Sequence, residues 1–184
     1  MLNRREFLLS SLATPLVLPS SIVQAQTAAS GKMLLAMHQN TSRAAGFRGS
    51  LEGWSRAGIE YVELNDTALD GFLENDTLIG ASNLLNDLGL TPVCAAAALP
   101  DLWIPGPARE TSLEAWRMRC DQFANLGLEK IYSPAVTNRP VTLEDYAATP
   151  EAIREVAEIS SEYDLTCMIA VSYTHLTLPT KRIV

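Results

Sequence analysis

The sequence has no glycine-rich phosphate-binding loop and few positive charges. Only 14 of its 184 residues are lysine or arginine, against 21 aspartates and glutamates, so the formal charge is −7. Residues 1–25 carry a net +1, which leaves −8 for the rest of the chain. A surface this acidic argues against a nucleic-acid partner, because phosphate backbones are bound by clustered lysines and arginines.

Cysteine is also scarce. Cys94, Cys120 and Cys167 are the only three, so they cannot all pair with one another. None of them has the spacing of metal ligands. Each lies in an apolar segment, which favours buried free thiols over a redox role.

The first 25 residues predict an export signal rather than part of the fold. Arg4-Arg5-Glu6-Phe7-Leu8 opens an apolar stretch, and Val23-Gln24-Ala25 offers the small residues expected before signal cleavage. The paired arginines resemble a twin-arginine signal, which engages the export machinery for folded proteins, so a periplasmic location is expected. Two prolines interrupt the apolar run, which favours this over a retained anchor, and we expect no stable membrane span. Residues 26–32 are expected to be a linker.

What the rest of the chain does have is a repeating strand-then-helix pattern. With 47% hydrophobic and 19% charged residues, its composition is that of a globular protein with a core. The expected strands are 33–38, 59–64, 91–95, 130–133 and 166–170. Each interval between strand starts fits one right-handed parallel βα unit, which predicts an α/β fold. The spacing alone is compatible with two architectures, an open doubly wound sheet and part of a closed barrel. The first strand ends in His38-Gln39-Asn40-Thr41 instead of a nucleotide-binding loop, which favours the barrel.

Capping patterns predict where the helices begin. Ser50 is expected to cap a helix that Gly58 ends. Thr111-Ser112-Leu113-Glu114 has the pattern of a capping box. Thr149-Pro150 supplies a cap and a proline at the first helical position of a later helix. The segment from Asp66 to Gly71 is expected to be loose.

The strongest candidate for a functional side chain is Glu63. Alternation along 59–64 places Tyr61 and Glu63 on one face, and Val62 and Leu64 on the other. Glu63 therefore lies near the carboxyl end of a buried strand, where parallel α/β folds collect their chemistry. A carboxylate there is either a substrate-facing group or a solvated strand end.

One stretch carries a family resemblance. Ala57-Gly58-Ile59-Glu60-Tyr61-Val62-Glu63-Leu64, preceded by a first strand that ends in a histidine, resembles the xylose isomerase-like TIM barrels of the sugar phosphate isomerase/epimerase family. Asn86-Asp87-Leu88-Gly89-Leu90 and Phe123-Ala124-Asn125-Leu126-Gly127 fit that family's rhythm of helix, glycine and next strand. The resemblance covers 33–170 and implies about five βα units of a TIM (β/α)8 barrel. A whole barrel needs about 250 residues, so we expect the front part of a longer gene product.

The resemblance also implies a function. The full-length protein would interconvert or dehydrate a sugar or polyol by metal-assisted proton transfer. A divalent metal (Mn, Co, Zn or Mg) would hold the substrate oxygens while flanking bases move the proton. Glu63 is then the expected catalytic and substrate-binding carboxylate, and His38 a second substrate contact. Trp103, in a proline-rich loop, is either a sugar-stacking lid residue or an anchor of that loop.

The fifth strand departs from the family pattern, because Ala170-Val171-Ser172 stands where a metal-binding glutamate is expected. No metal ligand is therefore assigned, and the chain as printed is expected to be inactive. Residues 171–184 resemble a translated sequencing adapter, with a natural ending as the alternative, so His175 is left out of the site.

Two other functional classes remain open. A non-catalytic periplasmic sugar-binding or interaction domain would be a complete open sheet. A nuclease of the endonuclease IV branch would need basic phosphate contacts, which the acidic chain does not offer.

Overall fold

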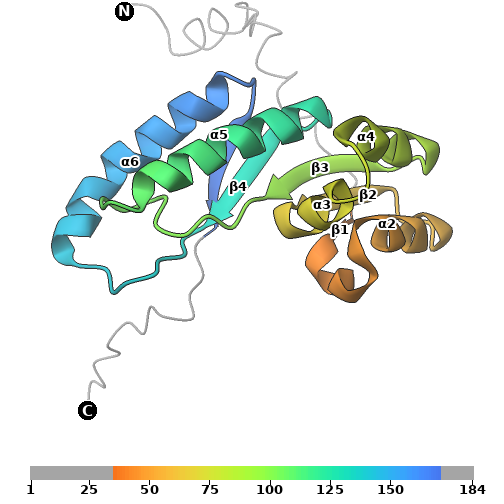
Figure 1. Cartoon of the computed structure of the whole chain (residues 1–184), viewed down its shortest axis with the longest axis horizontal. Helices are drawn as coiled ribbons and strands as arrows, with labels where there is room; N and C mark the ends of the chain where they lie inside the picture. Colours follow the sequence, from red (N-terminus) through yellow and green to blue (C-terminus); the bar gives the residue numbers. More distant parts are fainter. Residues whose placement is uncertain (1–34, 171–184) are drawn as a thin grey trace, which may run out of the picture. The chain divides into compact units, whose positions relative to one another are not determined.

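The computed structural model describes residues 35–170. The expected export signal (1–25), the linker (26–32), the first residues of the first expected strand and the tail (171–184) lie outside the described residues. Within 35–170, five parallel strands form one sheet in the order β1-β2-β3-β4-β5 (Figure 1).

The strands lie close to their expected positions. They are β1 (Ala36–His38), β2 (Tyr61–Asn65), β3 (Thr91–Ala96), β4 (Lys130–Pro134) and β5 (Thr166–Ala170). Every pair of neighbours is parallel and consecutive in the chain. A doubly wound sheet would reverse its strand order part-way, and this sheet has no such reversal. The expected succession of βα units, as in a barrel wall, is confirmed.

Helical segments fill the connections. They are η1 (Gln39–Ala45), α2 (Gly46–Arg56), α3 (Asp66–Leu73), α4 (Leu78–Asp87), α5 (Arg109–Asn125) and α6 (Leu143–Ser161). The long helices α5 and α6 run side by side along the part of the sheet that contains β4 and β5 (Figure 1). No helix in residues 35–170 combines the length and apolar character needed to cross a bilayer.

Ser50 does not cap a helix, so that prediction is wrong. The short helix η1 runs directly into α2, which places Ser50 one turn inside the helix and only 2% exposed. Its hydroxyl donates to the carbonyl of Phe47 at 2.9 Å and accepts from Gln39 at 3.2 Å. A serine that bonds back to its own helix in this way leaves no sequence signal that separates it from a cap.

The next two expected helix starts are also wrong. Helix α5 begins at Arg109, ahead of the expected capping box, and the Ser112 hydroxyl instead donates to the carbonyl of Pro100 at 2.6 Å. Helix α6 begins earlier than Thr149 and contains Pro150 in its interior. Its start is set by a capping box that joins Thr142 and Asp145, which the sequence analysis did not identify.

The segment after β2 is helical rather than loose. Helix α3 begins at Asp66 because the Asn65 side-chain oxygen accepts from the Ala68 N–H at 3.2 Å. Asparagine is among the strongest N-caps. The side chain that ends β2 therefore also starts α3.

The core lies between the sheet and its helices. Trp116 on α5 is fully buried, and its ring N–H donates to the Ser160 hydroxyl on α6 at 3.0 Å. Cys120 and Phe123, also on α5, are fully buried as well. Burial raises the pKa of the Cys120 thiol from 9.0 to about 12. All three cysteines are free thiols.

Candidate functional site

His38 and Glu63 meet at the carboxyl ends of β1 and β2. They are register partners on the two strands, and His38 Nε2 lies 3.3 Å from Glu63 Oε1. Each side chain keeps 22% of its surface exposed. Both side chains point to the same side of the sheet, while their roles in binding or catalysis stay predictions.

The alternation of β2 explains how a carboxylate reaches this position. Val62 and Leu64 are fully buried beneath the helices, whereas Tyr61 and Glu63 lie on the opposite face, which we call the inner face. A bulge between β2 and β3 then shifts the register, so that Glu63 pairs with Cys94. The bulge adds a thiol to the neighbourhood of the carboxylate.

The hydrogen bonds around His38 indicate which of its ring nitrogens carries the hydrogen. The backbone N–H of Asn40 donates to His38 Nδ1 at 2.8 Å, and the Thr41 hydroxyl donates to the His38 carbonyl at 2.8 Å. A neutral imidazole whose Nδ1 accepts carries its hydrogen on Nε2. His38 therefore faces Glu63 with an N–H and not with a basic nitrogen.

Tyr132 is the site residue that sequence reasoning missed. Its hydroxyl reaches from β4 and donates to Glu63 Oε1 at 2.5 Å. Burial and the hydrogen bond to Glu63 raise the Tyr132 pKa above its ordinary value of 10.0, so the phenol is protonated at neutral pH. Alternation along 130–133 gave a signal for its face, but its approach to Glu63 depends on the positions of three strands.

Cys94 completes the inner-face cluster, which consists of His38, Glu63, Cys94 and Tyr132. Burial and the charge of Glu63 raise the pKa of its thiol from 9.0 to about 11. Cys94 is therefore a neutral thiol at physiological pH, and thiolate chemistry is disfavoured there. The cluster offers one carboxylate, two neutral donors and an imidazole.

Trp103 lies apart from this cluster. Its ring is only 3% exposed and packs edge-on against Trp116, with ring centroids 6.4 Å apart. This is the environment of a loop anchor, the second of the two roles expected for it. The structure does not bring Trp103 together with His38 or Glu63 through any contact among the described residues.

The inner-face cluster does not by itself form the expected metal cage. No group of three or more histidines, cysteines, aspartates and glutamates in residues 35–170 is arranged to hold a metal ion. His38 and Glu63 are turned toward each other, and Tyr132 occupies the same carboxylate oxygen. The donor set of residues 35–170 therefore does not fit a divalent metal without further ligands.

Solved structures share this fold. The IolI protein with a bound zinc atom superposes with a TM-score of 0.67 at 14% identity, over 76% of this chain and 51% of that one. A sugar phosphate isomerase/epimerase from Parabacteroides distasonis gives 0.58 at 16% identity, over 79% and 53%. D-psicose 3-epimerase in the presence of D-fructose gives 0.61 at 17% identity, over 74% and 52%. No family model matches the chain, and no curated protein sequence does.

The fold is that of part of a xylose isomerase-like TIM barrel. The chain spans about half the length of the solved chains it matches. At these identities the likeness establishes the architecture alone. The positions of His38 and Glu63, at the carboxyl ends of the first two strands, are where this architecture places chemistry.

Proposed function

We propose that the full-length protein moves a proton between adjacent carbons of a sugar or polyol, with Glu63 as the proton-transferring group. The observation that carries the proposal is the arrangement of the Glu63 carboxylate. Oε1 accepts from the Tyr132 hydroxyl and faces the His38 N–H, and the side chain keeps 22% of its surface exposed. The carboxylate is thus held in place while part of it stays open to a substrate.

The chemistry follows from this geometry. The Glu63 carboxylate would accept the proton from a carbon next to a carbonyl and return it to the neighbouring carbon, as general base and then general acid. The Tyr132 hydrogen bond would keep the carboxylate plane fixed during both transfers. His38, whose Nε2–H lies beside the same carboxylate, would donate to a substrate hydroxyl or carbonyl oxygen.

The comparisons support a sugar as the substrate class. The D-psicose 3-epimerase structure was determined in the presence of D-fructose, and a D-allulose 3-epimerase structure holds D-allulose. A divalent metal remains part of the proposal for the full-length protein, with ligands supplied outside residues 35–170.

We also propose export after folding, which subcellular fractionation of a host that carries the intact gene would test.

A paired measurement tests the proposal. The chain as printed is compared with a version continued by the codons that follow residue 170 in its gene. Isothermal titration with manganese, cobalt and zinc is combined with a keto-sugar isomerisation assay. We expect weak metal binding and no turnover for the printed chain, and both activities for the longer one. Tight one-to-one metal binding with turnover by the printed chain would contradict the proposed need for further strands.

The runner-up is a non-catalytic sugar-binding domain. It would bind D-fructose in the longer protein without any proton exchange or isomerisation. Binding without turnover would therefore favour this alternative over the proposed enzyme.

A further inference from the structure

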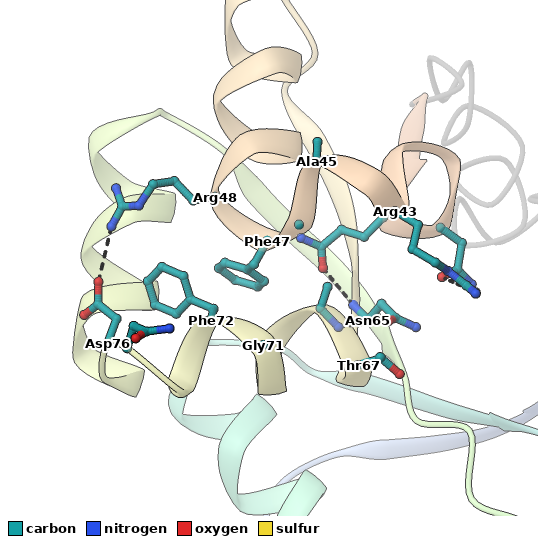
Figure 2. Close-up of a pocket in the computed structure, with 14 residues that line it drawn as sticks. Arg43, Ala45, Phe47, Arg48, Asn65, Thr67, Gly71, Phe72 and Asp76 are labelled. Carbon is teal, nitrogen blue, oxygen red and sulfur yellow. Dashed lines mark hydrogen bonds and ion pairs between the residues drawn. The ribbon is translucent and has the colours of Figure 1, made fainter.

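A second candidate site lies beside the inner-face cluster and shares no residue with it. It is a cavity of about 570 Å³ between the η1–α2 junction and α3. This volume is within the range of small-molecule pockets. Figure 2 shows Arg43, Asn65 and Thr67 toward one end of the cavity, and Arg48 with Asp76 at the other.

Arg43 gives this cavity an uncompensated positive charge. Its guanidinium donates to the neutral Asn40 side chain at 3.2 Å and has no carboxylate within 4.0 Å among the described residues. Every other arginine in residues 35–170 has a carboxylate partner within that distance. Arg48, at the far end of the cavity, is paired with Asp76 at 3.2 Å. A free guanidinium is unusual in a chain with a formal charge of −7.

Asn65 adds a second donor to the same end of the cavity. The residue is only 8% exposed, and its side-chain oxygen accepts from the Ala68 N–H. This hydrogen bond identifies which terminal atom of the side chain is the oxygen, so the other terminal atom is the amide nitrogen. No hydrogen bond within residues 35–170 involves that nitrogen, and the side chain lines the cavity. The nitrogen is not fully buried, so an acceptor bound in the cavity can reach it.

The wall also has an apolar part. Phe47 and Phe72 lie in contact, with ring centroids 5.0 Å apart. Gly71 leaves space next to them, since a Cβ added there would meet no atom within 4 Å. The cavity therefore has two donors at one end and an aromatic pair toward the other, where the Arg48 guanidinium lies 5.5 Å from the centre of the Phe72 ring (Figure 2).

We propose that this cavity binds a small organic anion, a carboxylate or phosphate carried on an apolar body. The oxyanion accepts from the Arg43 guanidinium and from the Asn65 amide nitrogen, and the apolar body extends past Gly71 toward Phe47 and Phe72. Arginine and neutral amide donors suit such an acceptor, because both present N–H groups and neither brings a negative charge. The proposal does not depend on the sugar chemistry of the inner-face cluster.

The test is a backbone-amide NMR titration of the full 184-residue chain. The probes are benzoate, phenyl phosphate, inorganic phosphate and uncharged benzyl alcohol. We expect at least one of the two aromatic anions to shift the amide signals of residues 43–48 and 65–72. The uncharged alcohol should bind at least about tenfold more weakly than that anion. Benzoate and phenyl phosphate separate the carboxylate source from the phosphate source.

Asn65→Asp is the sharpest variant. It keeps the oxygen that caps α3 but replaces the amide donor with a negative charge, so anion affinity should fall about tenfold or more. Asn83→Asp, on the exposed side of α4, makes the same charge change outside the cavity and should bind like the parent chain. Gly71→Leu fills the cavity without touching either donor and should abolish binding of both anions. Circular dichroism confirms that each variant is folded.

Three outcomes would overturn the proposal. In the first, neither anion shifts these amide signals. In the second, the Asn65→Asp variant binds the anion as tightly as the Asn83→Asp variant. In the third, the shifted signals belong to the inner-face cluster. A parallel titration with D-fructose reports on His38 and Glu63, so failure of the sugar proposal and failure of the anion proposal are seen separately.

Discussion

Two faces of the same strands differ in what they contribute. On β2, Val62 and Leu64 face the helices and are fully buried, whereas Glu63 between them stays partly exposed on the inner face. On β4, Ile131 is fully buried while its neighbour Tyr132 reaches Glu63. A period of two residues is enough to separate packing from chemistry within one strand. The outer face should therefore carry stability and the inner face function.

The largest expected difference in unfolding free energy is between substitutions at two adjacent residues of β2. Leu64→Ala removes a fully buried side chain and should cost about 2–5 kcal/mol of unfolding free energy. Glu63→Gln, one position away, keeps the shape and an acceptor oxygen and should change it by about 0.5 kcal/mol or less. Urea unfolding of both variants measures the difference. Equal losses would mean that the two faces do not divide in this way.

High pH should weaken the fold through the Cys94 thiol on the inner face and the Cys120 thiol on α5 in the core. Burial raises the pKa of Cys94 to about 11 and that of Cys120 to about 12, so the folded state holds these protons more tightly than the unfolded state. Stability is fully present below pH 9, falls as the unfolded chain ionises first, and levels off above the folded pKa values. Unfolding measured under reducing conditions from pH 8 to pH 11 should show this decline. A flat profile would contradict it.

Tyr132→Phe tests whether the hydrogen bond from Tyr132 to Glu63 mainly positions the carboxylate and contributes little to stability. The change removes the hydroxyl that Glu63 accepts, and the partly exposed site should limit the stability loss to about 1 kcal/mol. Denaturant unfolding gives the number, with Tyr146→Phe on the exposed side of α6 as the matched control. A loss several times larger would assign Tyr132 to the core instead.

The smallest expected effect concerns a helix cap. Thr142→Ala removes the capping box of α6 and should cost about 1 kcal/mol. Thr111→Ala changes a residue that has the sequence pattern of a cap but lies within the first turn of α5, so it should be nearly neutral. Thermal melts of the two variants distinguish the cap in the structure from the one suggested by the pattern.

The sequence predicted the sheet better than the helix starts. Strands were recognisable because β-branched and apolar runs follow glycines that end helices, a signal contained in a few adjacent residues. The starts of α2 and α5 were not, because the Ser50 hydroxyl bonds to Phe47 inside its helix, and Thr111 of the expected capping box lies within the first turn of α5. Local pattern cannot tell which carbonyl or N–H a hydroxyl will meet.

The candidate site was predictable only in part. His38 and Glu63 could be placed because strand ends converge in parallel folds, and their 3.3 Å approach agrees with that expectation. The approach of Tyr132, and the bulge that pairs Cys94 with Glu63, depend on contacts across strands far apart in the chain. The burial of Trp103 against Trp116 is likewise a tertiary contact that the proline-rich loop did not disclose.

Solvent deuterium exchange most directly tests the claim that the inner face transfers protons. The protein continued past residue 170 is incubated with D-fructose in D₂O, and deuterium at the carbons next to the carbonyl is followed by NMR. We expect exchange by the parent protein, a loss of about 10²-fold or more in Glu63→Gln, and no change in Glu60→Gln, whose carboxylate is exposed just before β2. Equal exchange by Glu63→Gln and Glu60→Gln would contradict the assignment of Glu63.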